Sequence, residues 1–310
     1  MPRPLRAPIY WFGGKGRLVS RLLPLVPSGG RPYCEPFSGA ASLLFARNPA
    51  PVEVLNDLDG RVVNLFRVLQ DPGLFPELQH RLKYTLYSRS EFARAIEILQ
   101  DESASPVMQA WATFVGFNQG FAAACNTVGD WGRVFTSNSG MASSTCAWIS
   151  RLNLLDVWHK RLQRVQVDSR DALEAIRYWD TEETVFYCDP PYVLSTRVKG
   201  KRNRYAVEQN DEFHAQLVEL LRTCRGAVVL SGYSHPIYTL LEESGWHRTE
   251  IRTSCHAAGR IRGSQLRGNG AARREVPRIE CVWRNPKAVK LAIKSPSRPG
   301  PFGRKIVARP

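Results

Sequence analysis

The sequence predicts an α/β fold, in which a largely parallel sheet carries a helical segment inserted between two of its strands. Short apolar runs, rich in β-branched and aromatic residues, alternate along the chain with segments of helical period. One stretch, from about residue 71 to 164, has helical patterns but no convincing strand. The chain has 310 residues, 43% of them hydrophobic, which is enough for one large or two modest domains.

The strands are expected at the short apolar runs, namely Val52–Leu55, Val165–Val167, Thr184–Cys188, Ala227–Leu230 and Ile279–Trp283. Helical patterns fall between these runs, at Gly60–Leu69, Asp211–Leu221 and Ile237–Glu243. Strands that alternate with helices favour parallel pairing, because a parallel connection needs a crossover and a helix commonly provides it.

The segment that interrupts this alternation contains helical patterns at Ser90–Leu99, Pro106–Phe117 and Ala147–Leu162. It also contains a loop rich in glycine, serine and asparagine, roughly Gly120–Ser144. Loops of this length are usually functional or mobile. We therefore expect residues 1–70 and 165–286 to form the α/β domain and residues 71–164 to form an inserted helical domain.

The balance of charge indicates a polyanionic partner. The chain has 43 Lys and Arg against 28 Asp and Glu, a net charge of +15, which favours nucleic acid ahead of a membrane surface. Basic residues concentrate at Leu194–Arg204 and Arg248–Arg278. We also expect residues 287–310 to be a basic, disordered tail, which either attracts phosphates or is a solvated end without a role.

Several classes of protein are not expected. No apolar stretch approaches the ~18 residues of a membrane span, and no signal peptide is recognisable at the start. The seven cysteines are scattered and form no CxxC pair, so neither a disulfide framework nor a metal site is expected. These features predict a soluble protein of a reducing, intracellular compartment.

The strongest candidate for chemistry is Asp189-Pro190-Pro191-Tyr192, which directly follows the predicted strand Thr184–Cys188. Ligands of open α/β sheets bind at the carboxyl ends of the strands, where this loop would lie. The prolines stiffen the loop, a carboxylate and a backbone carbonyl can accept hydrogen bonds, and the Tyr192 ring can stack on a base. The set suits a planar base with an exocyclic amine, although an ordinary proline turn is the alternative.

A second candidate binds a nucleotide-like ligand. Glu35-Pro36-Phe37 leads from a short strand into a turn at Gly39, whose lack of a side chain lets the backbone approach a ligand. Asp57 ends the next apolar run, eighteen residues after Gly39, where an acid can accept hydrogen bonds from ribose hydroxyls. A plain turn or cap is the alternative for Asp57.

Two further segments point to the same edge of the sheet. Tyr10-Trp11-Phe12-Gly13-Gly14-Lys15 lacks the full spacing of a phosphate-binding loop, but it can bring an aromatic ring and a cation to the ligand. Arg170 and Asp171 follow the strand Val165–Val167. Asp171 either binds the adenine of a cofactor or caps the helix that begins at Ala172.

Together these motifs resemble the DNA adenine-N6 methyltransferases of the Dam-like class, in the order GGK, EPFxG, an acid after the next strand, an insertion and DPPY. The resemblance covers about residues 8 to 286. It implies a Rossmann-like methyltransferase sheet with an inserted target-recognition domain, and S-adenosylmethionine as the cofactor. It also implies that Trp11, Lys15, Asp57 and Asp189 contact this cofactor. Residues 71–164 show no clear match to the recognition loop of enzymes that act on GATC, so the resemblance predicts no target sequence.

The implied reaction methylates an adenine flipped out of double-stranded DNA. Its N6 amine would donate hydrogen bonds to Asp189 and to the Pro190 carbonyl, and the basic segments would hold phosphates. A cytoplasmic location, at a bacterial nucleoid or in a phage-infected cell, follows, with no membrane and no obligate protein partner. The alternatives are methylation of cytosine N4, a non-catalytic DNA-binding module with a decayed cofactor site, and RNA as substrate.

Overall fold

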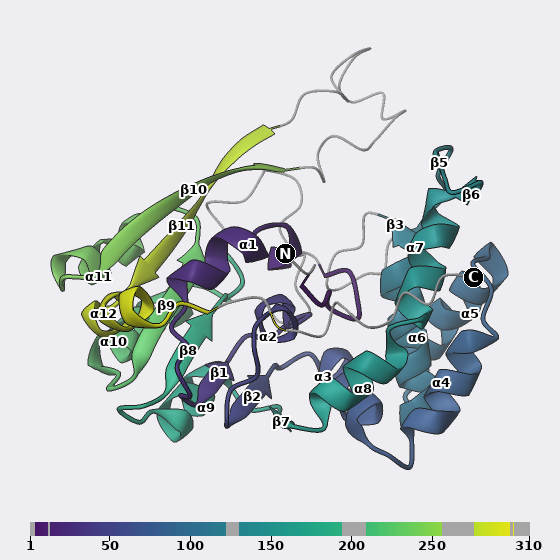
Figure 1. Cartoon of the computed structure of the whole chain (residues 1–310), viewed down its shortest axis with the longest axis horizontal. Coiled ribbons are helices and arrows are strands. Elements are labelled where there is room, and N and C mark those ends of the chain that lie inside the picture. The colour runs from purple at the N-terminus through teal and green to yellow at the C-terminus, as the bar shows by residue number, and fades with distance from the viewer. Residues whose placement is uncertain are drawn as a thin grey trace.

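The computed structural model describes residues 4–11, 13–121, 130–193, 209–255, 276–297 and 300. Its centre is a seven-stranded sheet with the order β10-β11-β9-β8-β1-β2-β7 (Figure 1). The strands are β1 (Tyr33–Glu35), β2 (Glu53–Asn56), β7 (Val165–Asp168), β8 (Val185–Cys188), β9 (Ala227–Gly232), β10 (His247–Cys255) and β11 (Val276–Arg284). The five strands from β9 to β7 are parallel, while β11 runs antiparallel to both β9 and β10. The predicted α/β fold with a largely parallel, Rossmann-like sheet is confirmed.

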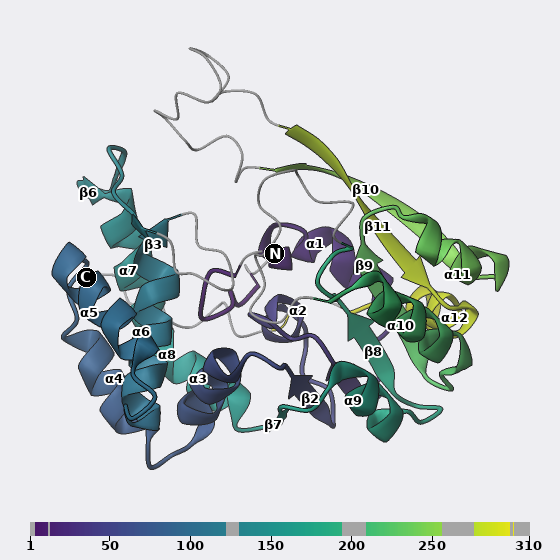
Figure 2. The ribbon, with the colours of Figure 1, turned by 180° about the vertical axis from the view of Figure 1, so that it is seen from behind.

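Helices cover both faces of this sheet, as a comparison of Figures 1 and 2 shows. One face carries α1 (Val19–Leu22), α2 (Ser42–Ala46) and α12 (Pro286–Lys294), and the other carries α9 (Ala172–Trp179), α10 (Asp211–Thr223) and α11 (Thr239–Glu243). Side chains alternate along β8, so that Tyr187 joins the first apolar core and Phe186 and Cys188 join the second. Burial of both faces explains why the strands have nearly continuous apolar sequences.

The inserted segment forms a helical layer beside the sheet (Figure 1). With the preceding α3 (Gly60–Gln70), it comprises α4 (Phe75–Lys83), α5 (Arg89–Gln100), α6 (Pro106–Gln119), α7 (Ser143–Leu152) and α8 (Leu155–Leu162). The Ser105 side chain accepts a hydrogen bond from the Met108 N–H, and Pro106 occupies the first turn, so α6 begins where such a cap predicts. The core of the first sheet face continues into this layer through residues such as Phe66, Trp111 and Trp158.

A buried ion pair joins the helical layer to the sheet. The Arg161 guanidinium of α8 donates to Glu53 at the start of β2, with Nη2–Oε1 at 2.7 Å, and to the Leu44 carbonyl at 3.0 Å. Both side chains of the pair are fully buried. Removing one partner would leave an uncompensated charge, so this contact fixes how the helices lie against the sheet.

The structure differs from the sequence prediction at three places in these elements. The predicted helix Ala147–Leu162 is divided into α7 and α8 by a turn at Asn153 and Leu154. Two-residue strands β3 (Gly120–Phe121), β4 (Asp130–Trp131), β5 (Ser137–Asn138) and β6 (Met141–Ala142) lie where only a loop was expected. Strand β10 was not predicted, because an edge strand exposes alternate residues and its sequence is correspondingly polar.

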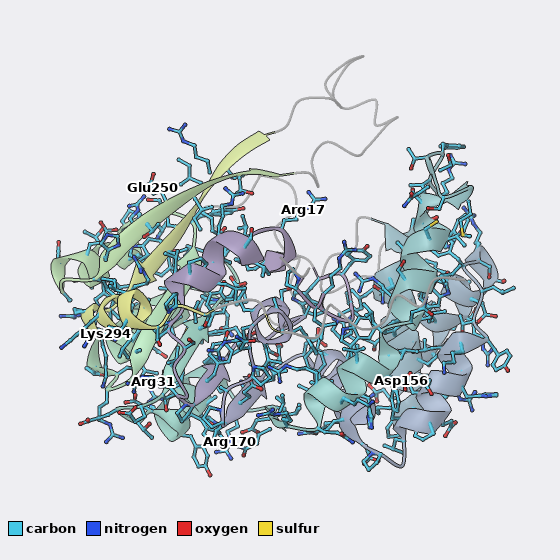
Figure 3. All side chains as sticks on the ribbon, in the orientation of Figure 1. Arg17, Arg31, Asp156, Arg170, Glu250 and Lys294 are labelled. Carbon is cyan, nitrogen blue, oxygen red and sulfur yellow. The ribbon has the colours of Figure 1, made fainter. Side chains whose placement is uncertain are left out.

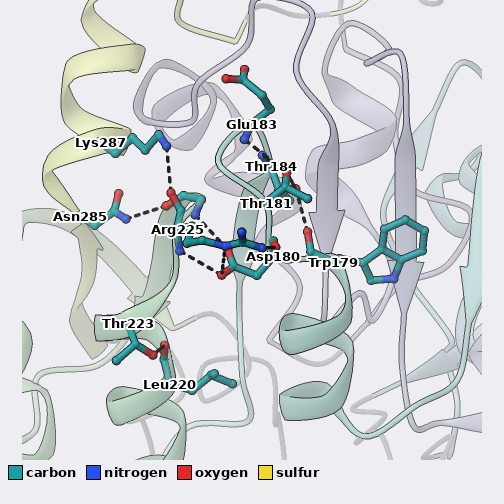
Figure 4. Close-up of polar contacts among 11 residues, drawn as sticks. Trp179, Asp180, Thr181, Glu183, Thr184, Leu220, Thr223, Arg225, Asn285 and Lys287 are labelled. Atoms are coloured by element: carbon teal, nitrogen blue, oxygen red, sulfur yellow. Dashed lines mark hydrogen bonds and ion pairs between the residues drawn. The ribbon is translucent and has the colours of Figure 1, made fainter.

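The prediction of a disordered tail over residues 287–310 is wrong for residues 287–294, which belong to α12 (Pro286–Lys294). Asn285 caps this helix, since its side chain accepts from the Ala288 N–H at 2.8 Å and donates to the Gly226 carbonyl at 2.9 Å (Figure 4). Lys287 donates to the Arg225 carbonyl at 2.9 Å, and Ala288 and Ala292 are buried. Small alanines, spaced four residues apart, therefore supply the buried stripe that large apolar residues usually provide.

The chain continues past α12 along the start of the fold. The Ser297 N–H donates to the Val26 carbonyl and the Gly300 N–H to the Ala46 carbonyl, both at 2.9 Å. Positions 298–299 and 301–310 lie outside the described residues. Among the residues that are described, no helix has both the length and the apolar composition of a membrane span.

Candidate functional site

The candidate site lies where the order of the parallel strands reverses. From β1 the chain continues to β2 and β7 on one side, whereas β8 and β9 extend the sheet on the other. Loops that leave the carboxyl ends of neighbouring strands at such a switch point diverge and form a crevice. The loops after β1, β2 and β8 carry residues 36–39, Asp57 and Asp189, and Glu35 is the last residue of β1.

These loops share one cleft, with an empty volume of about 860 Å³ that includes open solvent. Nine of the residues singled out in the sequence line it, namely Trp11, Lys15, Glu35, Pro36, Phe37, Gly39, Asp57, Asp189 and Pro191. Segments that are more than 150 residues apart in the chain therefore meet in one place.

Five other predicted site residues do not line the cleft. Pro190 and Tyr192 are buried beside it, while Tyr10 is half exposed, with the Arg151 guanidinium 4.0 Å from its ring centroid. Arg170 pairs with Asp168 and lies over the Tyr178 ring, at the lower edge of the molecule in Figure 3.

Asp171 is the fifth of these residues. Its side chain accepts hydrogen bonds from the N–H groups of Leu173 at 2.9 Å and Glu174 at 3.4 Å. Of the two interpretations that the sequence left open, these contacts correspond to the helix cap.

Asp57 holds the turn after β1 in place. Its two carboxylate oxygens accept hydrogen bonds from different backbone N–H groups, that of Gly39 at 2.7 Å and that of Asp59 at 2.9 Å. Burial raises the pKa of Asp57 to about 6, against the opposing effect of these N–H donors. Each oxygen keeps a second acceptor site, so the carboxylate can bind a ligand hydroxyl while it holds both loops.

Gly39 has a backbone conformation that a side chain would oppose. Its φ is +45°, and a Cβ atom built on it would lie 2.7 Å from the indole Nε1 of Trp11. Trp11 packs in turn on Phe117 of α6, with ring centroids 5.1 Å apart. The turn, the indole and the helical layer are therefore in direct contact at the cleft.

Gly39→Ala is expected to weaken cofactor binding about tenfold, since the left-handed φ costs roughly 1 kcal/mol and the indole must also move. Calorimetric titration with S-adenosylmethionine would measure this change. Gly60→Ala is a suitable control, because Gly60 lies at the start of α3 and a Cβ there meets nothing within 4 Å. Equal affinities of the wild-type and Gly39→Ala proteins would contradict the expectation that the Gly39 backbone approaches the ligand closely.

Glu35 is a buried carboxyl group in the lining of the cleft. Its Oε1 accepts hydrogen bonds from the Tyr33 hydroxyl and from the Leu44 N–H, both at 2.8 Å. Burial raises the pKa of Glu35 to about 8, because these two donors only partly offset the loss of water. A cation bound beside this carboxyl would favour its ionised form, so the position suits a positively charged part of a ligand.

Lys15 is a buried ammonium whose three N–H donors all have acceptors. It donates to Asp189 Oδ1 at 2.5 Å, to the Tyr192 hydroxyl oxygen at 2.7 Å and to the Gly13 carbonyl at 3.3 Å. Burial lowers the pKa of Lys15, but the carboxylates of Asp189 and Glu280 outweigh that effect and raise it. The lysine is therefore a fixed positive charge next to the DPPY loop.

Burial also raises the pKa of Asp189, to about 6, while Lys15 opposes and Glu280 adds to this increase. The Asp189 side chain is 18% exposed, so it is reachable from the cleft although Lys15 holds one of its oxygens. Asp189 can thus present a carboxylate acceptor to a ligand above about pH 6.

Sequence reasoning missed Glu280, a buried residue of β11. Its carboxylate accepts from the Tyr192 hydroxyl, at 2.8 Å for Oε1 and 3.0 Å for Oε2, and lies 3.5 Å from the Lys15 ammonium. The available signal was an acid within the apolar run Ile279–Trp283, since an isolated carboxylate in a buried strand requires a partner. Tyr192 also packs on Tyr233, with centroids 4.3 Å apart.

Most of the two strongly basic segments lies at residues 194–208 and 256–275, outside the described residues. Within the part of the chain that is described, no three His, Cys, Asp or Glu side chains are grouped as metal ligands.

Comparison with known proteins gives one match to a family. The model of the D12 class N6 adenine-specific DNA methyltransferases matches residues 11–255. No curated protein matches the sequence. Among solved structures, the rRNA methyltransferase aviRa from Streptomyces viridochromogenes is similar over 91% of this chain and 88% of its own, with 11% sequence identity and a TM-score of 0.33.

Proposed function

Because the chain belongs to the D12 class N6 adenine-specific DNA methyltransferase family, we propose that it methylates adenine N6 in double-stranded DNA with S-adenosylmethionine as donor. The resemblance noted in the sequence is thereby confirmed, as is the assignment of an adenine-specific DNA methyltransferase. The donor, the duplex substrate, the flipping of the base and the roles of individual residues belong to the proposal.

The observation that carries the proposal is the shared cleft. Glu35 at the end of β1 and Asp57 and Asp189 in the loops after β2 and β8 line one cavity together with Lys15. A reaction between a bound cofactor and a base needs both ligands in one place, because orientation supplies much of the acceleration. Had these three loops opened on separate surfaces, the motifs could not act together.

The donor would occupy the part of the cleft between the loops after β1 and β2. Asp57 would accept hydrogen bonds from ribose hydroxyls, and Gly39 would allow close approach of the backbone. S-adenosylmethionine supplies an electrophilic methyl group on a sulfonium. The carboxyl groups of Glu35 and Asp189 suit the positive charges of such a molecule.

The target base would enter beside the DPPY loop. Asp189 and the carbonyl of Pro190 would accept the two N6–H hydrogen bonds and orient the nitrogen toward the methyl group. The Asp189 carboxylate would stabilise the positive charge that develops on N6. Tyr192 supports this position through its packing on Tyr233 and its hydroxyl contacts with Lys15 and Glu280.

We further propose that residues 71–164 recognise the DNA and that the basic segments around 194–204 and 248–278 hold its phosphates. The target must leave the duplex, at a cost of about a few kcal/mol, because N6 is otherwise paired. The contact between Trp11 in the cleft and Phe117 of α6 supports this proposal, because it joins the helical layer to the wall of the cleft.

The catalytic rate is expected to fall below about pH 6, since protonation of Asp189 removes the negative charge that strengthens the N6–H hydrogen bond and stabilises positive charge on N6. The rate should be nearly constant from about pH 7 upward until another group titrates. Single-turnover rates with saturating DNA and donor, measured from pH 5 to 8, would show this acid limb. A rate that is independent of pH over this range would contradict a role for the Asp189 carboxylate.

The function is tested by methylating plasmid DNA with the pure protein and mapping modified bases by single-molecule sequencing. N6-methyladenine at a defined sequence is the expected product, and N4-methylcytosine would assign the other exocyclic amine. A protein that binds DNA, shows no heat with S-adenosylmethionine and gives no product would be a non-catalytic binding module.

A further inference from the structure

Glu280 is a buried carboxylate that belongs to none of the motifs along the chain. It lies on β11, the strand that runs antiparallel to the rest of the central sheet, and it is 3% exposed. Burial of a carboxylate costs several kcal/mol unless its partners compensate. The compensating partners are the hydroxyl of Tyr192 and the ammonium of Lys15, both at the candidate site.

The contacts determine the direction of each hydrogen bond. An ammonium only donates and a carboxylate only accepts, whereas a phenol has one proton. Because Glu280 accepts the phenol proton, the Tyr192 oxygen is left as an acceptor, and Lys15 donates to it at 2.7 Å. Glu280 therefore fixes the orientation of Tyr192 and, through it, the position of Lys15.

The balance of charge at the site also indicates a role for Glu280. Lys15 alone would neutralise Asp189, to which it donates at 2.5 Å. With Glu280 at 3.5 Å, a single cation faces two carboxylates, and the cluster keeps a net negative charge. A buried negative charge stabilises a neighbouring group on which positive charge develops.

We propose that Glu280 is a positioning residue for methyl transfer, which holds Tyr192 and Lys15 so that the cluster around Asp189 keeps a net negative charge toward the target amine. This inference rests on the proposed function. Glu280 is not among the residues that line the cleft, so it would act on the ligands through the two side chains that it contacts, Tyr192 and Lys15.

The charged and titratable groups that face Glu280 determine how the pH profile of the catalytic rate should change when the Glu280 charge is removed. Within the described residues they are Lys15 from the segment before α1, Asp189 and Tyr192 from the loop after β8 and Tyr187 from β8 itself. Cys281 also interacts electrostatically with Glu280, although its side chain lies on the opposite face of β11. Glu280 raises the pKa of Asp189, so the loss of its charge lowers that pKa. The acid limb of the rate profile should then move to lower pH.

The test is Glu280→Gln, an isosteric change that removes the charge, with Glu280→Asp as the variant that restores it. The catalytic rate of Glu280→Gln is expected to fall about tenfold or more, with donor affinity within about threefold of wild type. Its acid limb should lie at lower pH, and Glu280→Asp should recover part of the rate. The matched control is Glu219→Gln, an exposed residue of α10 that pairs with Arg222.

The outcomes separate this inference from the proposed function. Wild-type rate and pH profile in Glu280→Gln would overturn the role of Glu280 and leave the methyltransferase proposal intact. A reduced rate with an unmoved acid limb would also overturn it, because a structural defect lowers only the active fraction. Wild-type protein without N6-methyladenine product would overturn the proposed function and, with it, this inference.

Discussion

Asp189→Ala is expected to abolish methyl transfer, lowering the catalytic rate by about 10³-fold or more. The variant loses the acceptor that orients the N6 amine and the charge that stabilises it in the transition state. The fold should survive, because Lys15 keeps the Tyr192 hydroxyl and the Gly13 carbonyl as acceptors and has Glu280 nearby. Single-turnover formation of N6-methyladenine would measure the rate, and circular dichroism would report the fold.

Two further variants show whether the loss of activity is due to the charge of Asp189. Asp189→Asn keeps the shape and removes the charge, so it should be nearly as inactive as alanine. Asp156→Ala removes an exposed carboxylate of α8 that accepts from Gln79, and it should keep wild-type activity. Full activity of purified, folded Asp189→Ala would end the proposed mechanism.

The position of the cleft could be predicted from the sequence because it depends on one rule. Asp57 and Asp189 each follow an apolar run that has the length and composition of a buried strand, and Glu35 follows the shorter pair Tyr33-Cys34. The carboxyl ends of parallel strands meet at one edge of a sheet, so three loops far apart in the chain were expected together. The cleft of the structure is lined by all three residues.

The partners of Lys15 could not be predicted in this way. Its position after two glycines placed it near the ligand edge, but an ammonium in a loop is usually solvated. Burial of Lys15 requires Glu280, which is 265 residues further along and lies on an antiparallel strand. No local pattern connects the two, because the order of β11 in the sheet is a property of the tertiary fold.

Helix α12 shows that secondary structure, too, can depend on tertiary contacts that the sequence does not reveal. The charge and proline content of the tail resemble those of disordered chains. Helix α12 nevertheless forms, because the Asn285 side chain caps it and also binds the Gly226 carbonyl (Figure 4). A helix of nine residues is stable only where a surface receives its apolar face, and the sequence does not reveal that surface.

Asp57→Ala is expected to weaken binding of S-adenosylmethionine by about 10- to 100-fold, the effect of losing a hydrogen-bonded carboxylate. The variant loses the proposed ribose contact and also the two acceptors that hold the N–H groups of Gly39 and Asp59. Calorimetric titration would give the donor affinity. DNA affinity, measured by fluorescence anisotropy without donor, should change less than about twofold.

Asp71→Ala is a matched control for the backbone contribution. Asp71 also accepts two backbone N–H hydrogen bonds, from Gly73 at 2.7 Å and Leu74 at 3.0 Å, but it is exposed and outside the cleft. If Asp57 served only to hold the backbone of the loops, Asp57→Ala and Asp71→Ala would both lose thermal stability. Only Asp57→Ala would also distort the cleft. Asp57→Asn separates the two effects, since its amide oxygen can still accept one of the N–H bonds.

A ribose role requires Asp57→Asn, which keeps only one of the two N–H contacts, to weaken S-adenosylmethionine binding by more free energy than it costs in thermal stability, because the amide oxygen offers one acceptor where the carboxylate offers two. Titrations in which DNA affinity falls more than donor affinity would refute the ribose assignment. They would place the loop after β2 on the substrate side of the cleft. The donor would then have to bind nearer Lys15 and Glu35, and the target amine could no longer reach it from the DPPY loop.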